Sequence, residues 1–224
     1  MRIHRLERRL AVLFSTLYLL FCHWQSPGEK LSGKEIEQYM QQLEQGVRLP
    51  PADKAEFIDH LRAWAEADDG QAFYNFNLMR LYPQVQPVYG APAIAGSAAQ
   101  VNAHYESVAI PLLLKLGGYP LVAGGAQKTG SHSTNLVGFE PEIDQWSTLA
   151  AVRYASRRSF LQLLTTPEYM AVMPYKMAAL KLALVPVDGD IVIPDLRFVL
   201  ASLLLSLFLL IGWIRSARRL GRLR

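Results

Sequence analysis

Apolar residues in the first third of the chain follow a helical period. Between residues 30 and 70 they recur at the i, i+3, i+4, i+7 spacing of amphipathic helices, first at Ile36, Tyr39, Met40 and Leu43, then at Phe57, Ile58, Leu61, Trp64 and Ala65. Ser32 and Glu35 form a capping-box pattern before the first run, and Gly46 with Pro50 and Pro51 ends it. We expect a helical pair that packs on the domain that follows.

From residue 72 the pattern alternates between strand-like and helix-like segments. Strands are predicted at 72–82, 119–126, 146–154 and 180–187, and helices at 98–116, after Ser156 and from Pro167. Pro111 is expected to kink the first of these helices or split it in two, and residues 136–137 show weak strand character. The order strand–helix–strand, repeated, predicts a ferredoxin-like split βαβ domain of the α+β class over residues 72–187, with helices on one face of its sheet.

The strand FYNFNLMRLY carries two amides on one face. Its alternation sets Tyr74, Phe76 and Leu78 on one side and Phe73, Asn75, Asn77, Met79 and Leu81 on the other. We expect the all-apolar side to face the helices and the amide side to face the open side of the sheet. Asn75, Asn77 and Arg153 are therefore the candidates to line a ligand pocket there, with a purely structural polar network as the alternative.

The two longest uncharged apolar runs lie near the ends of the chain. Residues 10–24 and 198–214 would span roughly 22 and 26 Å as helices, against about 30 Å for the hydrocarbon core of a bilayer. Both are expected to be transmembrane helices, the first an uncleaved signal anchor with Trp24 at the interface. The alternative for residues 1–24 is a cleaved signal peptide, although no small-x-small cleavage site or lipobox is present.

The flanks of these runs are basic. Nine of the 23 Lys and Arg residues, but only one of the 19 Asp and Glu residues, lie in residues 1–9 and 215–224. Because basic flanks stay cytoplasmic, both termini are expected in the cytoplasm of a bacterium, with residues 25–197 outside its inner membrane. The position of the arginine-rich tail directly after an apolar run favours the membrane over nucleic acid as its partner. Cys22 is the only cysteine, which excludes an intrachain disulfide.

Several motifs resemble those of a family of domains of unknown function in the dimeric α+β barrel superfamily. They are FYNFNLMRLY, Leu116-Gly117-Gly118 before a strand, Ser156-Arg157 with Phe160, Pro167-Glu168-Tyr169, and the last strand at 180–187. The resemblance covers residues 72–187. It implies a homodimer in which two sheets close into a barrel. Relatives in the superfamily include antibiotic-biosynthesis-type monooxygenases, muconolactone-isomerase-like enzymes and haem-handling proteins.

Two hypotheses from different functional classes remain. The first is a membrane-anchored extracytoplasmic domain that binds a small, partly apolar molecule; if it is an enzyme, the resemblance implies cofactor-independent chemistry of a monooxygenase or isomerase kind. The second is a non-catalytic assembly or scaffold protein of the membrane. An apolar cavity beside Asn75, Asn77 and Arg153 favours the first, and a barrel packed solid with side chains favours the second.

The histidines give no metal-binding pattern. His60, His104 and His132 lack the paired spacing of a motif such as HExxH, so no metal site is predicted. His104 is expected on the surface. No cofactor is predicted, and haem is left open because a histidine would be its natural axial ligand. No catalytic residue is assigned from the sequence.

Overall fold

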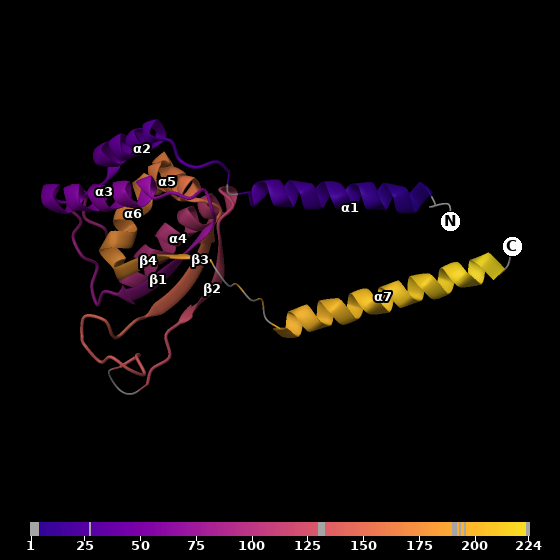
Figure 1. Ribbon diagram of the computed structural model, residues 1–224. Helices are drawn as coiled ribbons and strands as arrows, with labels where there is room; N and C mark the ends of the chain where they lie inside the picture. The colour runs from indigo at the N-terminus through magenta and orange to yellow at the C-terminus, as the bar shows by residue number, and fades with distance from the viewer. Residues whose placement is uncertain are drawn as a thin grey trace. The chain divides into compact units, whose positions relative to one another are not determined.

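The computed structural model describes residues 5–26, 28–129, 133–189, 192, 194 and 196–222. The chain divides into two units, Met1–Asp188 and Gly189–Arg224, and only the first contains the sheet. Its elements are α1 (Arg5–Trp24), α2 (Gly33–Gly46), α3 (Pro51–Glu66), β1 (Phe73–Leu81), α4 (Ala98–Lys115), β2 (Tyr119–Gly125), β3 (Thr148–Tyr154), α5 (Arg157–Thr165), α6 (Pro167–Ala179) and β4 (Leu180–Asp188). The second unit contains α7 (Leu196–Arg222) (Figure 1).

The four strands form one antiparallel sheet in the order β2-β3-β1-β4 (Figure 1). β1 lies inside the sheet, where Asn75 stands opposite Val152 of β3 and Pro186 of β4. Helix α4 connects β1 to β2, and helices α5 and α6 connect β3 to β4. This arrangement confirms the predicted ferredoxin-like α+β fold.

The helices cover the face of the sheet that carries the amides. Phe73, Asn75 and Asn77 are buried, whereas Phe76 is 46% exposed. The prediction that the all-apolar side of β1 faces the helices is therefore wrong. Period-two alternation determines which residues share a face of a strand, but the helices determine which face becomes the core.

Helices α2 and α3 belong to the same core as the sheet. The predicted capping box is present, because the Ser32 hydroxyl accepts from the Glu35 backbone and the Glu35 carboxylate accepts from the Ser32 backbone. Met40 and Leu43 of α2 are fully buried, and with Leu61 of α3 they form one cluster with the aromatic residues of β1 and β3. The helical pair therefore packs on the helix-covered face of the sheet.

Two local expectations fail at least in part. Helix α4 is continuous from Ala98 to Lys115, so Pro111 does not split it; Pro111 lies near its C-terminal end and removes only one backbone donor, and the kink stays a prediction. No strand forms at Leu136 and Val137, which are 83% and 86% exposed within the part of the β2–β3 loop that the structure describes. Without a neighbouring strand, a short apolar run has no ladder to join.

Helix α7 contains a stretch, Leu196–Arg218, that is long and apolar enough to cross a membrane, with a mean hydropathy of 2.2 over a window of 18 residues. It is the only helix of this kind among the residues that the structure describes. The predicted span at 198–214 lies within it. The predicted span at 10–24 lies in α1, whose described side chains are exposed, and it stays a prediction.

The C-terminal end of α1 is fixed to the sheet domain. Trp24 Nε1 donates to the carbonyl oxygen of Leu114 at 3.1 Å, and Gln25 Nε2 donates to the carbonyl oxygen of Gly117 at 3.2 Å. Gly117 has a φ of +77°, and a Cβ atom there would lie 2.6 Å from the Trp24 carbonyl oxygen. Glycine at this position therefore permits both the backbone turn and the close contact with α1.

Candidate ligand-binding site

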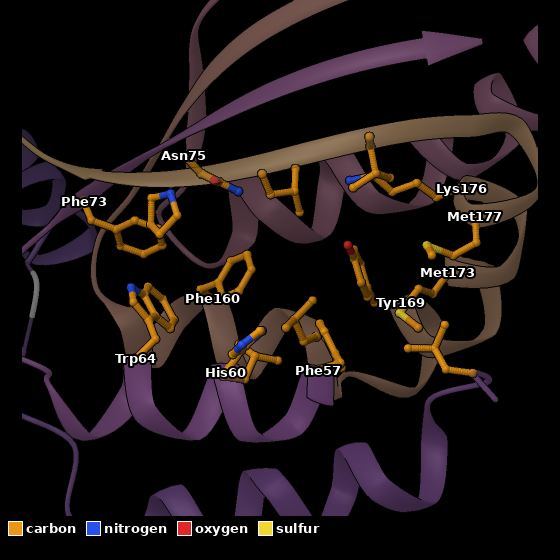
Figure 2. A pocket seen from close by; sticks show the side chains of 16 residues that line it. Phe57, His60, Trp64, Phe73, Asn75, Phe160, Tyr169, Met173, Lys176 and Met177 are labelled. Carbon is orange, nitrogen blue, oxygen red and sulfur yellow. The ribbon is translucent and has the colours of Figure 1, made fainter. Parts of the chain in front are cut away.

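A cavity of about 370 Å³ lies between the helix-covered face of the sheet and helices α3, α5 and α6 (Figure 2). It reaches the surface between α3 and the edge strand β4, where His60, Leu184 and Pro186 are exposed. Its volume falls in the usual range for small-molecule sites. The lining residues are Leu49, Phe57, His60, Leu61, Trp64, Phe73, Asn75, Phe160, Leu164, Tyr169, Met173, Lys176, Met177, Leu182, Leu184 and Pro186.

Helical spacing explains how distant segments contribute to this lining. Helix α3 supplies residues at i, i+3, i+4 and i+7, namely Phe57, His60, Leu61 and Trp64. Helix α6 begins with Pro167 at its first turn and supplies residues at i, i+4, i+7 and i+8, namely Tyr169, Met173, Lys176 and Met177. Each helix therefore presents one continuous stripe to the cavity.

Aromatic rings form one wall of the cavity. The ring of Trp64 lies 5.0 Å from that of Phe73 and 5.5 Å from that of Phe160, in both cases edge to face. Phe73 also stacks on Tyr154 at 5.1 Å. The capping box at Ser156 starts α5 and so determines where Phe160 lies. Interlocked rings of this kind make the wall rigid, which suits a preformed site.

The two amides of β1 have different surroundings. Asn77 Nδ2 donates to the carbonyl oxygens of Asn75 at 2.9 Å and Ala150 at 3.5 Å, and Asn77 does not line the cavity. Asn75 lines the cavity and is 3% exposed, yet its Oδ1 has no hydrogen-bond donor among the residues that the structure describes. A buried amide oxygen in this state is unfavourable, so Asn75 has an unused capacity for hydrogen bonding.

Lys176 is the only cationic ammonium in the lining described above. Its Nζ lies 5.1 Å from the centre of the Tyr105 ring, a cation–π contact. Burial lowers the pKa of Lys176 to about 8, against an opposing influence from the Glu106 carboxylate. The Tyr105 and Tyr169 hydroxyls lie 3.0 Å apart, and burial raises the pKa of both. The Tyr105 and Tyr169 hydroxyls are therefore neutral at physiological pH.

Arg153 lies on the opposite face of the sheet from this cavity. It stands opposite Tyr74 in the register, whereas Asn75 points to the other side. Arg153 Nη1 donates to Gln25 Oε1 at 2.5 Å, and its guanidinium lies 5.7 Å from the Tyr119 ring centre. The structure thus places only Asn75 of the three predicted residues in a cavity. The expected grouping of all three on the open side is wrong.

The sequence analysis did not predict that Lys176 and His60 line the site. Lys176 is a charged residue inside the apolar stripe of α6, and His60 lies within the stripe of α3; a polar residue in such a stripe was the available signal. His104 is exposed, with its ring 4.7 Å from that of Tyr175, and His132 lies outside the described residues. Within the described ranges no three His, Cys, Asp or Glu side chains group as a metal site would require.

The chain matches no protein-family model and no curated protein. Among solved structures it is similar to the RPA0582 protein of unknown function from Rhodopseudomonas palustris, at 22% identity and a TM-score of 0.49, over 62% of this chain and 94% of that one. The methylated form of the same protein gives 22% identity and a TM-score of 0.50, over 62% and 93%.

A more distant similarity is to a protein from Bacteroides thetaiotaomicron named as an antibiotic biosynthesis monooxygenase. The identity is 16% and the TM-score 0.32, over 56% of this chain and 93% of that one. A similarity at this level carries no argument about activity. The strand order and the similarity to the methylated Rhodopseudomonas protein together support the ferredoxin-like fold, and that similarity shows the fold alone.

Proposed function

We propose that this protein is a membrane-anchored binding protein whose α+β domain holds a small, largely apolar molecule in the cavity beside Asn75. The observation that carries the proposal is the buried Asn75 side-chain oxygen, which has no donor among the described residues and belongs to a residue lining a largely apolar cavity. Leaving such a group unpaired costs about 1–3 kcal/mol. A ligand that hydrogen-bonds to Asn75 removes this cost, and the aromatic wall holds its apolar part.

The membrane anchor is supported by helix α7. Its uncharged run at 198–214 is followed by arginines, among them Arg215 and Arg218, which favour a cytoplasmic C-terminus. We propose that the segment at 10–24 is a second span, which sets the domain outside the cytoplasm of a bacterial inner membrane. The scaffold hypothesis has less support, because a cavity of small-molecule size lies between the helices and the sheet, beside the packed core.

The open face of the sheet supports a homodimer. Among the described residues of the first unit, this face carries the exposed apolar side chains Phe76, Val122, Leu149, Val185 and Val187. A contiguous apolar surface on a sheet marks an interaction site or an aggregation hazard. We propose that the open face pairs with the same face of a second copy, as the resemblance to dimeric barrels implies.

The binding proposal can be tested with the neutral fluorescent probe N-phenyl-1-naphthylamine. The full chain, reconstituted in lipid nanodiscs, should bind the probe with a saturable rise in emission beyond that of empty nanodiscs. Replacing Met173→Trp fills the cavity and should abolish this saturable component. Tyr89→Trp, at an exposed loop position, adds the same indole elsewhere and should not. Equal saturable binding by the Met173→Trp variant would contradict the proposal.

A further inference from the structure

We infer that the ligand of this cavity carries a carboxylate, and that Lys176 is the residue that binds it. The inference rests on the proposed function and names the chemical class of its ligand. The inferred ligand is an amphipathic acid, which has an apolar body and a single negative charge.

The position of Lys176 is the first support. Figure 2 shows Lys176 and Asn75 on the sheet side of the cavity, and His60 and Phe57 on the side of α3. Lys176 lines the cavity together with Met173 and Met177 of the same helix, and the apolar stem of a lysine can cover such a surface. A carboxylate near this amine leaves the rest of the ligand against the aromatic wall at Trp64.

The charge of Lys176 is the second support. Among the ion pairs between described residues, none includes Lys176. Its Nζ contacts the face of the Tyr105 ring, which stabilises a cation less than a carboxylate does. A partly buried ammonium in an apolar lining is unfavourable unless it is paired. An anion that enters with an apolar body supplies the missing pair without leaving a second charge unpaired.

The rest of the lining limits the charge of the ligand to one. The only other ionisable side chains that line the cavity are His60, at its mouth, and Tyr169, which is buried. From α4, Tyr105 and the Glu106 carboxylate also influence Lys176, and Glu106 is itself negative. Lys176 therefore supplies one positive charge, which matches the single negative charge of a carboxylate but not the two of a phosphate dianion.

These groups also predict how binding depends on pH. Burial lowers the pKa of Lys176 to about 8, while burial keeps Tyr105 and Tyr169 neutral by raising their pKa values. An alkyl carboxylate stays ionised over the same range. Lys176 therefore loses its charge as the pH rises, and the affinity for a carboxylate should fall between about pH 7 and about pH 9.5.

The test compares two competitors that differ in charge, decanoate and decanol, by their displacement of N-phenyl-1-naphthylamine from the full chain in nanodiscs. Decanoate should bind about tenfold or more tightly than decanol at neutral pH, the factor expected of a charge-assisted hydrogen bond. This preference should disappear in Lys176→Met and persist in Lys176→Arg. Lys181→Met removes one positive charge from an exposed lysine of β4 outside the cavity, and it should keep the preference.

Each result has a distinct meaning. A preference for decanoate that survives in Lys176→Met, or that never appears in the wild-type chain, overturns the inference while leaving the cavity as a binding site. An absence of saturable probe binding by the wild-type chain overturns the proposed function, and the inference with it. If Lys176→Met does not fold, the pH series on the wild-type chain decides, because an affinity ratio that is constant across the series contradicts the role of Lys176.

Discussion

Asn75 and Asn77 share one face of β1 but only one of them is paired. The Asn77 amide donates to two backbone carbonyls of the sheet, and the Asn75 Oδ1 finds no donor among the described residues. A sequence pattern cannot separate the two, because both are amides at equivalent positions of one strand. Replacing each of them with leucine should nevertheless change the stability of the fold in opposite directions.

We expect Asn75→Leu to raise the melting temperature of the ligand-free chain by about 2–4 °C, since it removes roughly 1 kcal/mol of unpaired polar burial. Asn77→Leu is the matched control, and it should lower the melting temperature by a similar amount because it removes paired donors. Thermal unfolding in detergent, followed by circular dichroism, measures both. Destabilisation by Asn75→Leu equal to that by Asn77→Leu would show that Asn75 is part of a structural network.

At the scale of elements, the β2–β3 loop is organised by one carboxylate. Asp144 Oδ1 accepts from the backbone nitrogens of Thr134 at 2.9 Å, Asn135 at 3.0 Å and Gln145 at 2.6 Å. Arg80 Nη1 of β1 donates to the carbonyl oxygens of Pro141 and Asp144. These bonds order a segment that exposes Leu136 and Val137.

The Asp144 carboxylate should make this loop sensitive to acid. Hydrogen bonding, chiefly from Thr134, lowers the pKa of Asp144 below its usual value of about 4. Its contribution is therefore complete well above pH 4 and is lost as the pH falls through the lowered pKa. We expect the hydrogen-exchange protection factors of residues 134, 135 and 145 to fall on acidification below about pH 4, while those of β1 persist.

The matched variants for this prediction are Asp144→Asn and Glu140→Gln. Asp144→Asn should lower the same protection factors at neutral pH and remove their dependence on acid. Glu140 is an exposed carboxylate of the same loop, so Glu140→Gln should behave as the wild-type chain. If the hydrogen-exchange protection factor of Thr134 changes neither with pH nor with Asp144→Asn, the proposed role of this carboxylate is refuted.

The sequence predicted the positions of the helices and strands better than it predicted which face of β1 the helices cover. The capping boxes, the proline at the start of α6 and the alternating strands are local signals, and the structure has these elements within a few residues of the predicted positions. The cavity depends on which face of β1 the helices cover, and that depends on contacts between residues distant in sequence. The same reason explains why Arg153 was assigned to the ligand site, although it bonds to Gln25 on the other side of the sheet.

At the scale of the whole molecule, the open face of the sheet predicts the oligomeric state. We expect the full chain in detergent to have the mass of a dimer, measured by light scattering with the detergent contribution subtracted. Phe76→Lys should shift it to a monomer, because it sets a charge within the exposed apolar surface. Ile110→Lys makes the same change at an exposed position of α4 and should leave the dimer intact. A wild-type chain that is monomeric at all concentrations would contradict the proposed pairing.

The junction after α1 has a mechanical consequence. The side chains of Trp24 and Gln25 donate hydrogen bonds to the carbonyl oxygens of Leu114 and Gly117, respectively. The Arg153 guanidinium of β3 donates a third hydrogen bond to the side-chain oxygen of Gln25. These hydrogen bonds join the C-terminal end of α1 directly to α4 and β3. A force applied to α1 is therefore transmitted into α4 and β3, where it strains the domain.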